Sequence, residues 1–230
     1  MVTILTTDGL RPNEREAFWR HVMSDTIAPV AIHSMAAGNV AGSIDARWAG
    51  RLMIADVRST GQDIRRTPRQ INDADNAYVQ VAVVADGVGR VSQDDRQAVL
   101  RPGDCVVYQT TRPFQWLFDS DWDVWVFSFP SEAIQLSESE RRLMSAQRLD
   151  GSAGLTGVVS RFLLDVARHS EALPAGQSEQ VLARRAWSRA AVPDPLDQGL
   201  HQPASEGLDP RAGRDRRRGQ HLDALPAQAL

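Results

Sequence analysis

Histidine is the first residue type to examine, because a metal centre inside a β-barrel is held by histidines and a carboxylate that project inward. The five histidines are His21, His33, His169, His201 and His221. None falls in the β-rich segment from Ser43 to about Phe129, so neither that ligand set nor a Ser/His/Asp or Cys/His catalytic arrangement is expected there. Coordination by Asp45, Asp56 or Asp123 alone stays open, but solvated turn and strand-edge acids explain these residues better.

Lysine and cysteine chemistry is limited by composition. Every basic residue other than histidine is an arginine, which excludes a catalytic lysine, a Schiff base and a phosphate-loop lysine. The only cysteine, Cys105, allows neither an internal disulfide nor a thiolate cluster. It lies in the apolar run Cys105-Val106-Val107-Tyr108, which predicts a buried strand and an inert core thiol. We expect no metal, no cofactor and no enzymatic activity.

Two further motifs carry weak signals. Gly87 and Gly89 lack the third glycine and the helix of a dinucleotide fingerprint, so they indicate a turn. The run Arg65-Arg66-Thr67-Pro68-Arg69 could contact an anion, although a solvated edge or loop, with Pro68 ending a strand, is favoured.

Aromatic residues are dense in the β-rich segment, and most of them must form its core. An apolar ligand pocket uses the same residue types together with a few polar groups. The sequence therefore predicts a small-molecule site bounded by strands. The residues expected to form it are Arg47, Trp48, Tyr78, Gln80, Trp116 and Trp125.

Length and charge bound the class of protein. A chain of 230 residues with 42% hydrophobic residues suggests one or two globular domains. A net charge of −3 disfavours binding of nucleic acid by electrostatics alone. No targeting segment or membrane-spanning run is evident. A soluble protein of the reducing cytoplasm is expected.

The pattern of turns and apolar residues predicts a helix followed by a β-barrel. Asn13 and Glu16 have capping-box spacing, and Phe18, Trp19, Val22 and Met23 form an apolar stripe. Short β-rich runs then alternate with Gly, Asp and Pro turns. The expected strands are Ser43 to Trp48, Leu52 to Arg58, Tyr78 to Val84, Gly89 to Ser92, Gln97 to Leu100, Cys105 to Gln109, Phe114 to Phe118 and Trp122 to Phe129.

After Pro130 the apolar period becomes helical. One helix is predicted around Leu155 to Val166 and another at Gln177 to Trp187. The first carries a stripe that must pack on the barrel or on a second copy of the chain. The residues predicted to mediate dimerisation are Leu155, Val158, Val159, Phe162 and Val166.

The composition changes near Trp187. Five of the twelve prolines lie between Pro193 and Pro226, no aromatic residue appears, and apolar residues follow neither period. This is typical of a segment without a core. Folded structure is therefore expected to end near Trp187 to Ala190.

Several turns together resemble the sensor domain of AraC-type transcription regulators over about Phe18 to Leu136. The ordered set that carries the resemblance is Arg65–Arg69, Tyr78–Val81, Gly87–Gly89, Gln93–Arg96, Leu100–Asp104, Tyr108 and Thr111–Phe114. The resemblance implies an effector-binding, cupin-like barrel, helices for self-association, and a C-terminal pair of helix-turn-helix motifs that read DNA. That pair is not recognisable in this sequence.

The expected class is therefore α+β: a mainly antiparallel cupin-like β-barrel with an N-terminal helix, a short helical dimerisation segment and a disordered tail. The predicted boundaries are 1–136 for the effector domain, 137–188 for the helical segment and 189–230 for the tail. The predicted function is effector sensing and homodimerisation for an AraC-type regulator, without DNA binding by this chain. The competing reading is a stand-alone cupin metalloenzyme, such as a dioxygenase or isomerase, which tightly held metal would favour.

The last expectation concerns the origin of the tail. Read one nucleotide later, a permitted choice of codons for Gly207 to Leu230 encodes a segment that resembles the first helix-turn-helix of AraC-type regulators. The residues after about Trp187 are thus predicted to be a frameshifted remnant of the DNA-binding domain. An ordinary disordered tail is the alternative.

Overall fold

The structure, a computed structural model, describes residues 2–35, 40–71 and 77–169. Three α-helices occur in these ranges: α1 (Pro12–Thr26), α2 (Glu138–Met144) and α3 (Gly154–Arg168). The strands are β1 (Val2–Thr6), β2 (Ala31–Ser34), β3 (Gly42–Ala49), β4 (Leu52–Ser59), β5 (Gln62–Arg66), β6 (Tyr78–Asp86), β7 (Gly89–Gln93), β8 (Arg96–Leu100), β9 (Cys105–Gln109), β10 (Phe114–Phe118) and β11 (Trp122–Pro130). No helix of the described ranges is long and apolar enough to cross a membrane.

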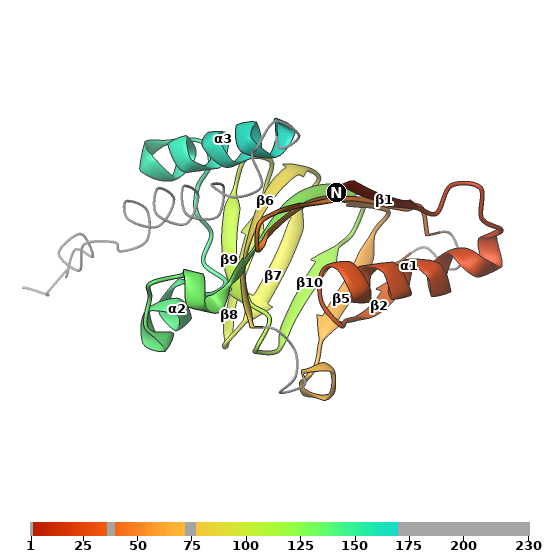
Figure 1. The fold of residues 1–230 in the computed structure, drawn as a ribbon, viewed down its shortest axis with the longest axis horizontal. Coiled ribbons are helices and arrows are strands. Elements are labelled where there is room, and N and C mark those ends of the chain that lie inside the picture. The colour runs from red at the N-terminus through yellow and green to blue at the C-terminus, as the bar shows by residue number, and fades with distance from the viewer. Residues whose placement is uncertain (1, 36–39, 72–76, 170–230) are drawn as a thin grey trace, which may run out of the picture. The chain divides into compact units, whose positions relative to one another are not determined.

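The strands form two antiparallel sheets (Figure 1). Sheet A has the order β1-β3-β4-β11-β6-β9, and sheet B has the order β2-β5-β10-β7-β8. The mainly antiparallel α+β class is confirmed. The predicted β-barrel takes the form of these two separate sheets, which do not close into one continuous barrel in the described ranges. Side chains from both sheets meet between them and hold the layers together.

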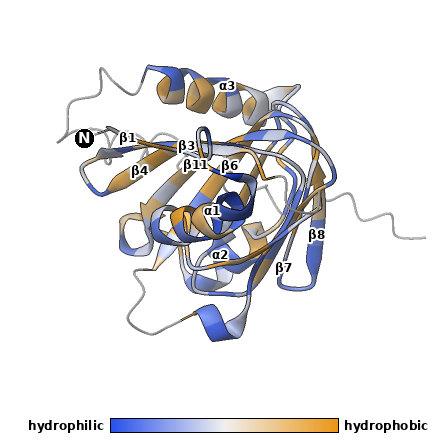
Figure 2. Cartoon of the chain, turned by 90° about the vertical axis from the view of Figure 1, so that its right-hand side faces the viewer, coloured by the Kyte–Doolittle hydropathy of each residue, from blue (hydrophilic) through white to orange (hydrophobic). Residues whose placement is uncertain are grey.

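Sheet A is covered on both faces because its central strands are apolar at nearly every position. Val124 and Val126 of β11 point toward sheet B and belong to the inner core between the sheets. Phe127 and Phe129 point the other way, into an outer core beneath α3. Alternate residues of a strand face opposite sides, so one continuous apolar run supplies two cores. Figure 2 shows the hydrophobic colouring of these strands beside α3.

Helix α1 contributes to the inner core from one side of the two sheets. Its buried residues are Trp19, Val22 and Met23, as the apolar stripe predicts. The Trp19 indole packs against Gly42, where a Cβ would collide with the ring. Its Nε1 donates a hydrogen bond of 3.0 Å to Oε1 of the buried Gln62. The helix begins at Pro12, where it was expected to open, but the capping pair is Arg11 and Glu14 and not Asn13 and Glu16: the Glu14 carboxylate accepts from the backbone N–H of Arg11 (3.3 Å).

Three strands and one helix were not predicted. Strand β5 lies inside sheet B between β2 and β10, so the interpretation of the Arg65–Arg69 run as a solvated edge or loop is wrong for its first part. Arg66 is only 2% exposed, and its guanidinium donates to the carbonyl oxygens of Thr110 (2.7 Å) and Pro29 (2.6 Å). Strands β1 and β2 and the short helix α2 are the other missed elements.

The C-terminal part of the described chain follows the prediction as far as it can be compared. Helix α3 spans the predicted stripe, and Leu163 and Ala167 are buried in the outer core. The predicted helix from Gln177 to Trp187, the predicted end of folding near Trp187 to Ala190 and the predicted disordered tail lie outside the described residues.

Candidate effector-binding site

A row of aromatic side chains lines the inner face of sheet B. Phe114, Trp116 and Phe118 alternate inward along β10, and each is at most 6% exposed. The rings of Trp116 and Phe118 stack with centroids 5.3 Å apart, and the Phe118 ring stacks on Trp122 at 4.2 Å. The Tyr108 ring, which belongs to sheet A, meets Phe114 edge-on at 4.9 Å. The two sheets are therefore joined by an aromatic cluster.

A small cavity of about 40 Å³ lies within this inner core. Its wall includes Met23 and Ile27 at the end of α1, Ile64 and Trp116 from sheet B, and Val124 from sheet A. A space of this size holds little more than a water molecule or a methyl group. A ligand of even one ring must therefore push part of the wall outward. The end of α1 belongs to that wall, so ligand entry would involve this helix.

Few polar groups face the inner core. Gln80 is fully buried on β6, beside Tyr108 on β9 and Ser128 on β11. Its Nε2 donates to the carbonyl oxygen of Ile27 (3.2 Å) and to Oγ of Ser128 (2.9 Å). Its Oε1 has no hydrogen-bond partner within the described ranges. An unpaired buried acceptor costs about 1–3 kcal/mol, so this atom favours a ligand or water molecule that brings a donor.

The Tyr108 hydroxyl stays neutral in this environment. Burial raises the pKa of Tyr108 well above its ordinary value, and a hydrogen bond with Trp116 offsets part of the rise. Burial likewise raises the pKa of Cys105 to about 11. The thiol is therefore protonated near neutral pH, as expected for an inert core cysteine. Neither group has the activation that nucleophilic chemistry requires.

The structure separates the six residues that the sequence assigned to an effector site. Trp116 lines the cavity, and Gln80 lies on the facing sheet. Trp48 and Tyr78 line a different, open hollow of about 310 Å³ beside the ion pair of Arg51 and Glu132.

Arg47 and Trp125 lie away from both places. Arg47 is paired with Asp45 (2.8 Å), and Trp125 packs against the outer core. The six residues therefore do not surround one pocket. Sequence reasoning left Tyr108, Phe114, Met23 and Ile27 out of the site, although the alternation along β10 already places Phe114 on the same face as Trp116.

Carboxylates gather on the outer face of sheet A. Asp56 pairs with Arg58 (2.5 Å), and Arg58 also reaches Asp123 (3.1 Å). Burial and the neighbouring Asp56 raise the pKa of Asp123 to about 7, against the effect of Arg58. Among the described residues there is no group of three or more His, Cys, Asp or Glu side chains placed to hold a metal ion.

A second open hollow, of about 570 Å³, lies at one end of sheet B. Arg65, Gln115, Ser92 and Gln97 stand opposite one another on four neighbouring strands and point to this side. Its wall is polar and charged, whereas the inter-sheet cavity is apolar. The two spaces suit different ligands.

The predicted dimerisation stripe divides between two environments. Val159 and Val166 pack partly buried against the outer core, as Leu163 does fully. Leu155, Val158 and Phe162 are 47%, 55% and 37% exposed. We call these three residues the α3 patch.

One family model matches most of the chain. The family model described as the AraC-binding-like domain matches residues 19–196. A protein of Bacillus sp. (strain OxB-1), described as an uncharacterized protein in the nit 5′ region, is 27% identical over 168 residues, which cover 73% of this chain and 65% of that protein. The chain thus spans a little under two thirds of the length of this relative.

Comparison with solved structures shows which known proteins have a similar fold. The AraC-like transcriptional activator CuxR superposes with a TM-score of 0.69 at 13% identity, over 81% of this chain and 67% of CuxR. A cupin superfamily protein of Desulfitobacterium hafniense matches with a TM-score of 0.31 at 13% identity, over 39% of this chain and 76% of that one. Because the family model covers most of the sequence, the chain belongs to the AraC-binding-like domain family.

Proposed function

We propose that this chain is the effector-sensing part of an AraC-type transcription regulator, and that its effector binds between the two sheets. One observation carries the proposal: an aromatic-lined space lies between the sheets, and the buried Gln80, which donates a hydrogen bond to Ile27 of its wall, has an Oε1 without a partner in the described ranges. Effector sites combine an apolar wall with one or a few placed polar groups. Trp116 and Gln80 are the two predicted residues that serve this site.

The wall restricts the chemistry of the effector. Val57, Ile64 and Val124 offer only hydrocarbon, and the aromatic rings favour a flat partner. Gln80 Oε1 accepts, so the effector needs at least one hydrogen-bond donor. A compact, mainly apolar ring compound with a hydroxyl, amine or amide N–H satisfies both conditions. It would displace Met23 and Ile27, because the cavity of about 40 Å³ is smaller than a ring.

A cupin-type metalloenzyme is the competing function, and it needs metal ligands on the strands. The one histidine on a described strand is His33 of β2, whose Cα partner is Asp63. A single imidazole beside one carboxylate falls short of the usual ligand sets. We therefore infer a binding protein without enzymatic activity.

Self-association through the α3 patch is part of the proposal. Leu155, Val158 and Phe162 form an apolar face on a helix whose opposite face is already packed. Covering such a face with a second copy of the chain removes it from water. Val159 and Val166 would support the interface from beneath.

We further propose that this chain does not bind operator DNA with sequence specificity and that it acts in the cytoplasm. The net charge of −3 supplies little attraction for phosphate. The predicted frameshift after about Trp187 concerns residues outside the described ranges, and the nucleotide sequence of the gene decides it. Specific nanomolar binding of operator DNA by the purified chain at physiological salt would contradict this part.

The site is tested by binding of small ring compounds to the full chain, with phenol and indole as probes in calorimetric titrations. Val124→Ile adds one methylene inside the cavity, and Val99→Ile adds the same group at a position that is 43% exposed. We expect the affinity for a probe to fall by about tenfold in Val124→Ile, because one lost methylene-sized space costs about 1 kcal/mol or more. The affinity should be unchanged in Val99→Ile. Equal affinities in the two variants would place the probe elsewhere.

A further inference from the structure

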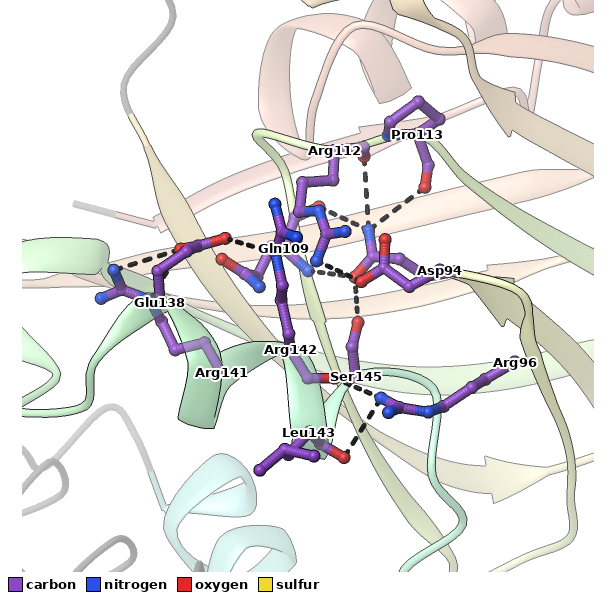
Figure 3. Close-up of polar contacts among 11 residues, drawn as sticks. Asp94, Arg96, Gln109, Arg112, Pro113, Glu138, Arg141, Arg142, Leu143 and Ser145 are labelled. Carbon is purple, nitrogen blue, oxygen red and sulfur yellow. Dashed lines mark hydrogen bonds and ion pairs between the residues drawn. The ribbon is translucent and has the colours of Figure 1, made fainter.

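Gln93, the last residue of β7, connects parts of the chain that are far apart in sequence. Its side chain is 3% exposed. Its Oε1 accepts hydrogen bonds from the backbone N–H of Gln109 (2.9 Å) and from Oγ of Ser145. Its Nε2 donates to the carbonyl oxygens of Gln109 (2.9 Å), Arg112 (3.3 Å) and Pro113 (3.3 Å). Figure 3 shows Gln109, Arg112, Pro113 and Ser145 gathered at this point.

Two of these partners are chain neighbours of the cavity wall. Gln109 directly follows Tyr108, and Pro113 directly precedes Phe114. Tyr108 and Phe114 both line the inter-sheet cavity, and their rings touch edge-on at 4.9 Å. A peptide plane is rigid, so a ligand that displaces the Cα of Tyr108 or Phe114 together with its ring also moves the adjacent backbone group that Gln93 holds. Gln93 is therefore bonded next to one wall residue of each sheet.

The other partner lies in the connection between α2 and α3. Ser145 directly follows α2, and its hydroxyl is held by Gln93. The next residues pair with the free edge of β9: the N–H of Ala146 donates to Val107 (2.9 Å), and Leu149 exchanges two backbone hydrogen bonds with Cys105 (3.0 and 2.9 Å). Residues 145–149 thus attach the segment that leads into α3 to the edge of sheet A.

The hairpin that bears Gln93 makes a second contact with α2. Arg96, on the other side of the tight turn at Asp94 and Asp95, donates to the carbonyl oxygens of Arg142 and Leu143 at the end of the helix. Both turn residues have positive φ, 58° and 59°, which fixes a two-residue hairpin of the right twist. The β7–β8 hairpin is therefore attached to the cavity wall at Gln93 and to α2 at Arg96.

We propose that Gln93 couples the inter-sheet cavity to the α2–α3 connection, so that a ligand which displaces Tyr108 or Phe114 changes how firmly residues 145–149 pair with β9. This inference rests on the proposed function, because it assumes that the cavity takes a ligand. Its physical basis is one buried amide that satisfies backbone groups on the cavity side and the Ser145 hydroxyl on the helix side. Any movement of one set strains the bonds to the other.

If Gln93 only stabilises the fold, mutations there and in the cavity wall should act differently than if Gln93 couples the two regions. If Gln93 only added stability, a change in the cavity wall and a change at Gln93 would have additive effects on the pairing of residues 145–149 with β9. Coupling requires that the effect of the wall change depend on Gln93. A double-mutant cycle separates the two roles without any ligand, so the outcome is independent of whether an effector is found.

The cycle uses amide hydrogen exchange of Ala146 and Leu149, measured by NMR on the full chain. Phe114→Leu reshapes the cavity wall. With Gln93 present, we expect it to raise the exchange rates of both amides by about tenfold, and in the Gln93→Leu background by less than about twofold. Ser145→Ala is a milder second background that removes only the last bond, and we expect the same loss of response there.

Gln97→Leu is the matched control, because Gln97 lies on the same hairpin but is exposed on the outer face of sheet B. The response to Phe114→Leu should keep its full size in this background. If Phe114→Leu changes the two exchange rates by the same factor with and without the Gln93–Ser145 bond, or does not change them at all, the coupling is refuted. That result would leave ligand binding in the cavity intact. Conversely, absence of probe binding would contradict the proposed site and leave the measured coupling unchanged.

Discussion

The carboxylate of Asp104, in the turn between β8 and β9, lies 2.7 Å from Nε of Arg148 in the α2–α3 connection. The same carboxylate accepts hydrogen bonds from the backbone N–H groups of Arg101 (2.9 Å) and Gly151 (3.1 Å). Asp104 is 2% exposed, so these donors replace the water that the charge has lost. One buried acid therefore fixes the turn and the connection together.

The first prediction concerns the removal of this acid. Asp104→Ala leaves the two N–H groups without an acceptor, and we expect the free energy of unfolding to fall by about 2–4 kcal/mol. Arg148→Ala should lower it by much less, because the Arg148 side chain is 41% exposed and the two backbone N–H groups still bind the carboxylate. Asp119→Ala, which removes an exposed partner of Arg90, is the control and should cost less than about 0.5 kcal/mol. Urea denaturation measures all three, and equal losses for Asp104 and Asp119 would contradict the assignment.

The same site has a predictable response to acid. Burial alone would raise the pKa of Asp104, but the hydrogen bonds from Arg148, Arg101 and Gly151 outweigh burial and lower it. A carboxylate with a lowered folded-state pKa stabilises the fold above its unfolded-state pKa, and this contribution is lost as the pH falls through the folded-state value. Wild type and Asp104→Ala should therefore converge in stability toward low pH. A constant difference from pH 7 to pH 2 would contradict this.

Asp123 should respond to pH in the opposite sense. Its pKa is raised from 3.8 to about 7, first by burial and then by Asp56. Between these values the folded state binds more protons than the unfolded state, so the contribution of this group to stability falls as the pH rises. Asp123→Asn should flatten that fall and be more stable than wild type at pH 8. Thermal unfolding from pH 5 to pH 8 measures the effect. A wild type that is still more stable than Asp123→Asn at pH 8 would contradict the prediction.

Close packing of two turns gives a steric prediction. A Cβ added to Gly151 would collide with the carbonyl oxygen and carbon of Gly103, in the turn that also holds Asp104. Gly151→Ala should therefore lower the free energy of unfolding by more than about 2 kcal/mol, because the atoms that the new Cβ meets are backbone and cannot rotate away. Gly154→Ala is the comparison: Gly154 has φ +63° and open space around it, so only backbone strain of about 1 kcal/mol is expected. Similar losses of unfolding free energy in the two variants would show that the backbone at Gly103 shifts to accommodate the added Cβ.

Self-association is predicted to depend on the α3 patch. Val158→Glu places a charge in the middle of the exposed face and should shift the full chain from dimer to monomer in analytical ultracentrifugation. Arg161→Glu changes charge on a neighbouring exposed position without removing apolar area, and it should shift the equilibrium far less. A wild type that is monomeric at every accessible concentration would overturn the predicted interface.

The sequence predicts strands β6 to β11 well, because their apolar and turn residues follow simple rules. The bounds of β9 and β10 are those expected, Cys105–Gln109 and Phe114–Phe118. Strand β5 was missed because Ile64 is its only apolar residue. Gln62 and Arg66 are buried but satisfied by hydrogen bonds, and Asp63 and Arg65 pair with each other on the outside. When the buried positions of a strand are polar residues with distant hydrogen-bond partners, the sequence shows no apolar alternation. Hydrophobic periodicity therefore does not reveal such a strand.

The site was predicted less well for a related reason. Trp116 and Trp125 stand in similar apolar runs, yet one faces the inner core and the other the outer core. Alternation tells which residues share a face, but it does not tell which face meets sheet B when both faces are covered. That choice depends on where α3 packs. The positions of Met23 and Ile27 at the cavity depend on how α1 docks, which long-range contacts such as Trp19 with Gln62 decide.

The position of a bound probe tests the central claim most directly. The full chain, labelled at its Ile, Leu and Val methyl groups, is titrated with phenol or indole, and nuclear Overhauser contacts from the probe are recorded. The account predicts contacts to Val57, Ile64 and Val124, which line the inter-sheet cavity. Contacts confined to outer-core methyls such as Ile54 and Leu163, or a bound probe that touches none of the cavity methyls, would contradict it.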